Sequence, residues 1–214
     1  KKEGTDFSKA STISFAPFTT MMFADSNLLL AQLGFSGDEI SGLEGSSFTG
    51  KQATKKKFLG QISGHYIINL ATHAIASDSP GKPSYIVFAP WNATQKTDYL
   101  LYSPEIYNLS MKNNKLIILS ACETGYGKLV KGEGVMSLSR AFAYAGCPTI
   151  LTSLCKSVVE ATAFFARKLH WYLAKGLPID LAVQASKNDY LSASKINPPW
   201  TYPPYWAHTV FLVN

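Results

Sequence analysis

Two stretches of the sequence decide the fold: residues 66–73, YIINLATH, and residues 115–123, KLIILSACE. Each is a short apolar run that ends in small and polar residues, which is typical of a strand buried on both faces of a parallel sheet. If the two strands are neighbours, their carboxyl ends lie at one edge of the sheet, where open α/β folds carry their sites. We therefore expect His73 and Cys122 to meet there, and an imidazole facing a thiol is the minimum equipment for catalysis by cysteine.

Composition favours a folded protein of one domain. The chain has 214 residues, of which 46% are hydrophobic and 16% are charged. No apolar stretch approaches the ~20 residues that cross a bilayer, and the N-terminus lacks an apolar signal segment. Three cysteines, an odd number, favour a reducing compartment over a disulfide framework. We expect a cytoplasmic protein without membrane attachment, and the missing initiator Met suggests a piece of a longer polypeptide.

Strand-like runs alternate with helical patterns, which predicts an α/β fold with a mainly parallel sheet. Besides the two deciding strands, we expect strands at 11–15, 148–153 and 207–212 and a hairpin of 85–88 with 99–102. Helical patterns cover 27–33, 52–62, 135–144, 158–175 and 178–191, a further helix opens at 103–105, and 125–134 is a glycine-rich loop.

The formal net charge of +6 raises the question of nucleic-acid binding. The lysines are dispersed apart from Lys55-Lys56-Lys57, and no RNA-binding aromatic motif accompanies them. A solvated helix face explains this triplet better. We expect no direct nucleic-acid binding.

The two strand ends supply the parts of a cysteine nucleophile. A free thiol has a pKa of ~8.5, so Cys122 needs His73 to remove its proton or hold the thiolate. The backbone N–H of Cys122 and one N–H just after His73, at Ala74 or Ile75, are candidate donors to an oxyanion. Glu123 is assigned structural hydrogen bonding, since a neighbouring carboxylate raises a thiol pKa.

The remaining cysteines and histidines read as structural. Cys147 stands at a strand entry between Gly146 and Pro148, where core packing explains it, and His65, His170 and His208 are more simply structural than functional. No Cys/His pairing has zinc-ligand spacing, and no phosphate loop ends in Gly-Lys-Ser/Thr. We expect neither a metal nor a cofactor.

Several strings together resemble the CHAT family of caspase-like cysteine peptidases, which is related to separase. They are residues 68–73, 119–127, 132–142, 144–146, 152–154 and 205–207. The resemblance covers roughly residues 35–214 as a peptidase domain, with residues 1–34 as a poorly defined N-terminal part. It implies a caspase-like three-layer sandwich with a mainly parallel central sheet flanked by helices.

The resemblance also implies roles and partners. Cys122 and His73 align with the family's catalytic dyad, and Ala74 with an oxyanion donor beside the N–H of Cys122. CHAT domains commonly follow TPR repeats, and some are defence proteases switched on by an RNA-guided CRISPR effector. We therefore expect a protein substrate and regulation by an upstream TPR region or a partner protein. No TPR pattern lies in this chain.

Three departures from the family pattern matter. Ala74 stands where Gly is usual, and its Cβ restricts the backbone, so we expect the oxyanion hole to need activation. Cys155 replaces a usual Trp, and Val158 and Val159 replace a polar residue and an Asp. In relatives such as separase that Asp receives a basic residue before the scissile bond. We assign Cys155, Val158 and Val159 to the substrate pocket and expect it to prefer an uncharged residue.

Two other functions compete with a peptidase. One is a catalytically inactive interaction domain that keeps the fold as a docking platform, and the other is a cysteine-dependent amidase of small molecules. Fast thiol labelling of Cys122 at mildly acidic pH argues against the first, and an open groove at the dyad argues against the second.

Overall fold

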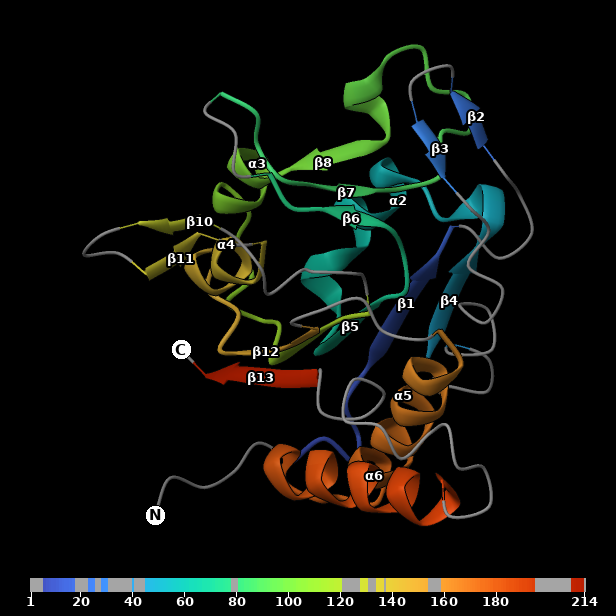
Figure 1. The fold of residues 1–214 in the computed structure, drawn as a ribbon, viewed down its shortest axis with the longest axis vertical. Coiled ribbons are helices and arrows are strands. Elements are labelled where there is room, and N and C mark those ends of the chain that lie inside the picture. Colours follow the sequence, from blue (N-terminus) through green and yellow to red (C-terminus); the bar gives the residue numbers. More distant parts are fainter. Residues whose placement is uncertain are drawn as a thin grey trace.

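The centre of the fold is a six-stranded sheet with the strand order β13-β12-β9-β5-β1-β4 (Figure 1). The computed structural model describes residues 6–17, 23–25, 28–30, 40, 45–77, 81–120, 128–130, 134–136, 138–153, 159–194 and 209–213. In sequence order the strands of this sheet are β1 (Thr12–Ala16), β4 (Ser46–Thr49), β5 (Ile67–Leu70), β9 (Leu116–Leu119), β12 (Thr149–Ser153) and β13 (Thr209–Val213).

All neighbouring strands from β4 to β12 are parallel, and β13 alone runs antiparallel, against β12. This confirms the prediction of a mainly parallel sheet and places both deciding strands, β5 and β9, side by side within it. Buried strands need apolar side chains on both faces. Every residue of β5 and β9 is buried, and all of them except Asn69 are apolar.

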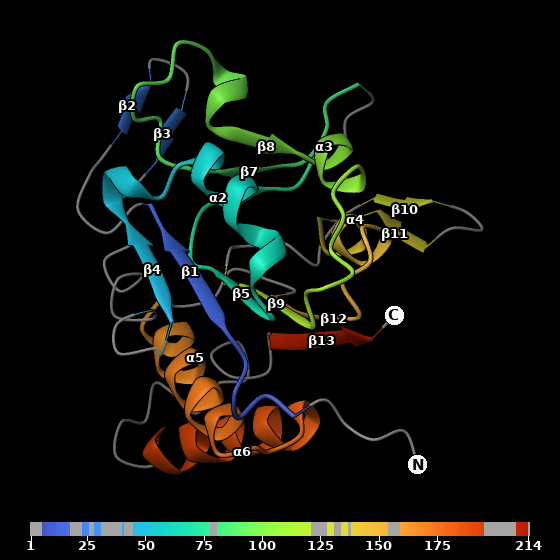
Figure 2. The ribbon, with the colours of Figure 1, turned by 180° about the vertical axis from the view of Figure 1, so that it is seen from behind.

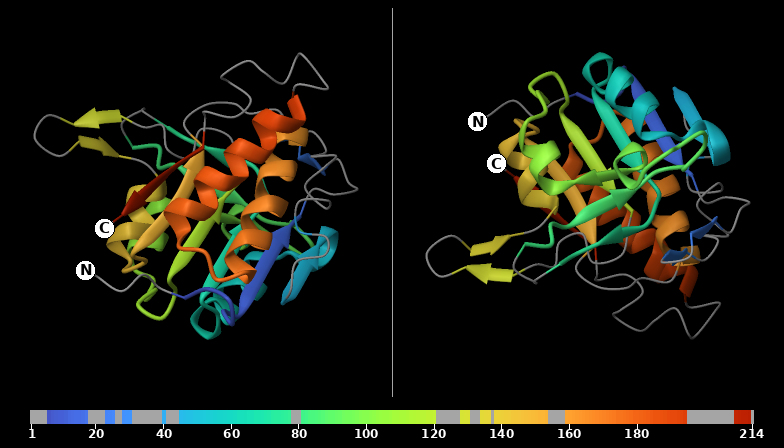
Figure 3. Two further views of the ribbon diagram at one scale, coloured as in Figure 1. Left: turned by 90° about the horizontal axis from the view of Figure 1, so that it is seen from below. Right: turned by 90° about the horizontal axis from the view of Figure 1, so that it is seen from above.

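Successive side chains of these strands point to opposite faces of the sheet and enter two separate cores. Ile68 and Ile117 pack with α2 (Lys55–Gln61), α3 (Ser103–Tyr107) and α4 (Leu138–Tyr144). Ile67 and Ile118 pack with α5 (Val159–Ala174) and α6 (Ile179–Ser194). The result is three layers, with α5 and α6 covering one face of the sheet (Figure 3).

Helix α5 shows why the sequence forms this outer layer. Phe165, Leu169 and Leu173 recur every four residues and are buried against the sheet. The helix ends where Gly176 adopts a φ of 81°, which lets Leu177 N–H donate to Tyr172 O over 3.1 Å. Among the helices of the described ranges, none is both long and apolar enough to cross a membrane.

A small antiparallel sheet is inserted between β5 and β9. It has the order β6-β7-β8, formed by β6 (Ala74–Ile75), β7 (Tyr85–Val87) and β8 (Leu100–Tyr102), with the 3-10 turn η3 (Lys96–Asp98) before β8. The pairing of Tyr85 with Tyr102 confirms the predicted hairpin. Strand β6 begins at the residue after His73, so the inserted sheet starts directly beside this candidate residue.

Two predicted helices are wrong at their N-terminal parts. Residues within 27–33 form β3 (Leu28–Leu30), which pairs with β2 (Phe23–Asp25), and the start of 135–144 belongs to β11 (Gly134–Met136), which pairs with β10 (Lys128–Val130). In both places a hairpin partner supplies the backbone hydrogen bonds that a helix turn would have made. Two further 3-10 turns flank α2, namely η1 (Gly50–Gln52) and η2 (Ile62–Gly64).

Candidate active site

The carboxyl ends of β5 and β9 lie side by side at one edge of the sheet (Figure 2). Leu70 pairs with Leu119 in register, and Ser120 N–H extends the pairing by donating to Leu70 O over 2.9 Å. His73 stands three residues after Leu70, and Cys122 stands three residues after Leu119. The strands that precede these two residues in the chain therefore end at the same edge of the sheet. Cys122 itself lies outside the described residues.

Strand β7 holds the chain at His73 through the His73 carbonyl and the side chain of Thr72. The N–H of Val87 donates to the carbonyl oxygen of His73 over 2.9 Å. The hydroxyl of the buried residue Thr72 donates to the carbonyl oxygen of the same Val87 over 2.5 Å. His73 is half-buried. Its main chain is thus fixed by the inserted sheet, while its position three residues beyond β5 is fixed by the central sheet.

The direction of the Ala74 N–H follows from the contact between His73 and Val87. In a trans peptide the carbonyl of one residue and the N–H of the next point in opposite directions, and no peptide bond in the described ranges is cis. Because His73 C=O points toward β7, Ala74 N–H points away from it, to the open side of β6. Of the described non-glycine residues only Asn92 has a positive φ, so the Ala74 backbone lies where a Cβ is tolerated.

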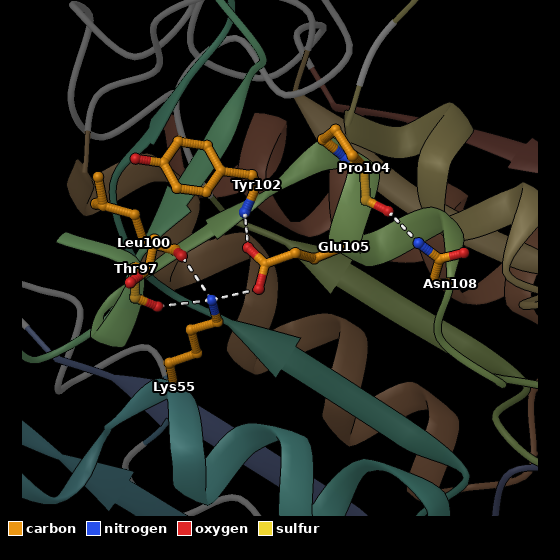
Figure 4. Close-up of polar contacts among 7 residues, drawn as sticks. All are labelled: Lys55, Thr97, Leu100, Tyr102, Pro104, Glu105 and Asn108. Atoms are coloured by element: carbon orange, nitrogen blue, oxygen red, sulfur yellow. Dashed lines mark hydrogen bonds and ion pairs between the residues drawn. The ribbon is translucent and has the colours of Figure 1, made fainter. Parts of the chain in front are cut away.

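Lys55 ties α2 to the inserted sheet through three polar contacts (Figure 4). Its Nζ donates to Thr97 O and Leu100 O, both over 2.8 Å, and lies 2.5 Å from Glu105 Oε1. The other carboxylate oxygen of Glu105 accepts from Tyr102 N–H over 2.9 Å at the start of α3. Lys55 is 5% exposed. The predicted solvated face is therefore wrong at Lys55, although Lys56 and Lys57 are exposed.

The helix period is the signal that marks Lys55 as an inward residue. Lys55, Phe58 and Ile62 follow the spacing of one helix face, and all three are buried. The first turn of α3 carries Pro104, as the predicted helix opening required, and Asn108 Nδ2 donates back to Pro104 O over 2.9 Å. These contacts fix the far end of the same insertion that begins beside His73.

The predicted substrate pocket falls after β12, the other neighbour of β9. Thr152 pairs with Leu119, so the segment that leaves β12 does so at the edge where His73 lies. Cys155 and Val158 lie outside the described residues, and Val159 is described only as the first residue of α5.

Cys147 lies at the opposite edge from His73, because it precedes β12. It is buried, and its Sγ contacts Thr149 O at 3.4 Å. Burial raises the pKa of its thiol to about 11. This environment fits the structural role that its position predicts. Within the described ranges, no three His, Cys, Asp or Glu side chains are grouped so as to hold a metal ion.

His170 is a histidine that its surroundings keep neutral. Its Nε2 is buried in α5 without a hydrogen-bond partner in the described part of the chain. Burial lowers the pKa of its imidazole to about 4. A half-buried histidine with a buried Nε2 and an uncharged imidazole fits the predicted structural role of this residue.

Comparison with known proteins points to one family and one fold. A family model described as CHAT domain matches residues 19–213. The separase of Saccharomyces cerevisiae, solved as a separase–securin complex, matches 95% of this chain with a TM-score of 0.60 and 13% identity. Porphyromonas gingivalis RgpB, solved with its pro- and mature domains, matches 95% of it with a TM-score of 0.55 and 11% identity.

A further similar structure is the Arg-specific cysteine proteinase gingipain R, with a TM-score of 0.55 and 10% identity over 95% of this chain. The chain spans 12% of the separase chain and 47% and 46% of the two gingipain chains. None of the curated proteins matches this sequence.

Proposed function

Because this chain belongs to the CHAT domain family and has a caspase-like peptidase fold, we propose that it is a cysteine endopeptidase domain. Cys122 is the nucleophile and His73 is the general base and acid. The observation that carries the proposal is the in-register pairing of Leu70 with Leu119. This pairing supports the proposal, because the strands that precede His73 and Cys122 end at one edge of the sheet.

The reaction proceeds through an acyl-enzyme. His73 takes the proton of the Cys122 thiol, and the sulfur attacks the scissile carbonyl carbon to form a C–S bond. His73 then gives its proton to the leaving amine as the peptide C–N bond breaks. Water, deprotonated by His73, attacks the thioester and releases the carboxylate product and the free thiol. No metal or redox partner takes part.

Two backbone N–H groups, those of Ala74 and Cys122, hold the oxyanion of each tetrahedral intermediate. The orientation of the peptide between His73 and Ala74 supports this role, because its N–H is directed away from β7. The negative φ at Ala74 shows that Ala at this position needs no left-handed backbone.

The residue before the scissile bond enters a pocket formed by Cys155, Val158 and Val159. The exit of the chain from β12 at the same edge as His73 supports this assignment. Two valines in place of a polar residue and an Asp remove the carboxylate that would neutralise a basic side chain. The domain therefore selects an uncharged residue at this position.

The domain works under the control of an upstream TPR region or a partner protein, in the cytoplasm. The family resemblance supports this, since CHAT domains commonly follow TPR repeats and some are switched on by CRISPR effectors in bacterial defence. The securin in the similar separase structure is an example of a protein partner in this fold. The substrate is a protein.

Cleavage and thiol chemistry together test the proposal. Candidate partner proteins are incubated with the wild type and with Cys122→Ala, and we expect products from the wild type alone. Iodoacetamide at pH 6 should label Cys122 within minutes and leave Cys147 unlabelled until the chain is unfolded. Equal processing by both proteins removes Cys122 as the nucleophile. A Cys122 as unreactive as Cys147 favours the rival function, a catalytically inactive interaction domain.

A further inference from the structure

An open cleft lies where the outermost strand of the central sheet passes into α2. Its volume is about 510 Å³, and it is lined by Phe48, Lys51, Gln52, Thr54, Lys57 and Trp91. Strand β4 is parallel to β1, and β1 is parallel to β5. The cleft, which begins at the carboxyl end of β4, therefore opens at the same sheet edge as the site around His73.

Two lysine ammonium groups lie over aromatic rings in this cleft. Lys51 Nζ is 3.9 Å from the centroid of the Trp91 ring, and Lys57 Nζ is 4.7 Å from the centroid of the Phe48 ring. Among the described residues neither lysine forms an ion pair with a carboxylate. Trp91 is 48% exposed, although it is a large apolar side chain. The cleft thus offers two unneutralised cations on partly apolar walls, which is complementary to carboxylate side chains.

The adjacent strand favours an extended polypeptide as the occupant. In the part of the chain that the structure describes, no strand pairs with the outer edge of β4. Three of its four residues are exposed. Such an edge presents backbone N–H and C=O groups to which an extended segment adds as a further strand. A phosphodiester group only accepts hydrogen bonds, whereas an extended polypeptide pairs with both the N–H and the C=O groups of this edge.

The chain between the cleft and the catalytic edge is short. Val87, which donates to His73, is followed four residues later by Trp91. An extended chain spans at most about 3.6 Å per residue, so the two α-carbons are at most about 14 Å apart. Between them, Ala89 N–H donates to Ala53 O over 2.9 Å and fastens this segment beside the cleft.

We propose that this cleft binds an acidic, extended segment of the protein substrate to one side of the scissile bond. The inference rests on the proposed peptidase function, because it takes the occupant to be the substrate. The lysines select glutamate or aspartate side chains, and the exposed edge of β4 takes the backbone. The pocket after β12 and this cleft then bind two separate parts of one substrate.

Binding is tested on the full chain carrying Cys122→Ala, so that the result does not depend on cleavage. The probe is a fluorescein-labelled dodecapeptide of alternating Glu and Val, followed by fluorescence anisotropy at low and high NaCl. We expect binding that weakens with salt. Replacing both Lys51→Gln and Lys57→Gln should weaken it about tenfold, since each exposed ion pair contributes up to about fivefold.

Two matched variants act as controls. Lys56→Gln removes an exposed lysine from the same helix outside the cleft. Lys175→Gln removes a lysine whose Nζ lies 5.6 Å from the ring centroid of Trp171, another exposed tryptophan. Both should leave the affinity unchanged, and circular dichroism should show every variant folded.

The outcomes separate this inference from the proposed function. Two further probes are the same peptide with Gln in place of Glu and a twelve-nucleotide oligo-dT. The acidic-segment site would be overturned if the Glu peptide does not bind or if the Gln peptide binds equally well. It would also be overturned if the control variants lose as much affinity or if oligo-dT binds more tightly. Binding with the expected variant pattern supports it. If the active chain then cleaves no peptide or candidate protein that carries such a segment, the peptidase function fails while the binding result stands.

Discussion

Val87 and His73 face each other across the first pair of strands in the inserted sheet, and one hydrogen bond of 2.9 Å between them orients the next peptide group. The carbonyl of His73 is engaged by β7, so the N–H of Ala74 faces the other way. The hairpin that follows His73 in the chain therefore sets the direction of a backbone donor at the edge of the central sheet. Several measurable consequences depend on this arrangement.

Thr72→Val should lower kcat about tenfold and leave KM unchanged, because it removes the hydroxyl that holds Val87 O while keeping the side-chain shape. The free energy of unfolding should fall by about 1 kcal/mol. The matched control is Ser186→Ala, which removes another buried hydroxyl, donating to Ala182 O over 2.7 Å in α6. It should cost similar stability and leave kcat intact. Equal losses of kcat in both variants would contradict a positioning role for Thr72.

Under the proposed function the wild type prefers an uncharged residue before the scissile bond, and Val159→Asp should add cleavage after Arg or Lys. A carboxylate in the pocket pairs with a basic side chain, and a charged hydrogen bond of this kind is worth about tenfold in kcat/KM. A peptide library with every residue at that position measures the preference for both proteins. Leu181→Asp, on the exposed face of α6, adds the same charge elsewhere and should change nothing. Strong Arg or Lys preference in the wild type would refute the assignment.

Glu105→Ala should destabilise the fold more than Lys55→Met does. Removing the carboxylate leaves a buried ammonium unpaired and also frees Tyr102 N–H, at a cost of about 3 kcal/mol. Removing the lysine leaves a carboxylate whose side chain is 42% exposed and two carbonyl groups without a donor, at about 1–2 kcal/mol. Urea unfolding measures both. The reverse order would show that packing, not the buried charge, dominates at this contact.

Acid should destabilise the protein partly through His170. Its folded pKa of about 4 lies below the unfolded value of ~6.5, so between these values the unfolded chain binds a proton that the folded one does not. Stability should therefore fall by about 2 kcal/mol between pH 7 and pH 5. His170→Phe should abolish this part of the slope, and His65→Gln should retain it. An unchanged slope in His170→Phe would place the effect elsewhere.

The sequence predicts the central sheet well because strands buried on both faces appear as short, continuous apolar runs. Residues 67–70 and 116–119 are apolar runs closed by small and polar residues, and the structure has strands at both. Their pairing is consistent with the expected neighbours, but the register of Leu70 against Leu119 depends on contacts between distant segments. No local pattern encodes it.

The incorrect predictions at residues 28–30 and at Lys55 also arise because contacts between distant segments decide the structure there. Leu28, Leu29 and Leu30 are three consecutive apolar residues with neither a helical nor an alternating period, and pairing with β2 decides their state. Lys55 looks solvated beside Lys56 and Lys57, yet carbonyl groups more than forty residues away accept from it. Hydrogen-bond acceptors from distant parts of the chain offset the cost of burying the ammonium group. A prediction from neighbouring residues alone cannot include them.

The order of the strands also decides when the central sheet can form during synthesis of the chain. β5 can pair with β9 only after the whole intervening insertion has been synthesised. Such non-local parallel pairing is a slow step in folding. A ribosome-bound fragment that stops short of β9 has His73 but lacks the strand that pairs with β5 and the segment that bears Cys122. The central sheet therefore forms only after most of the domain has left the ribosome.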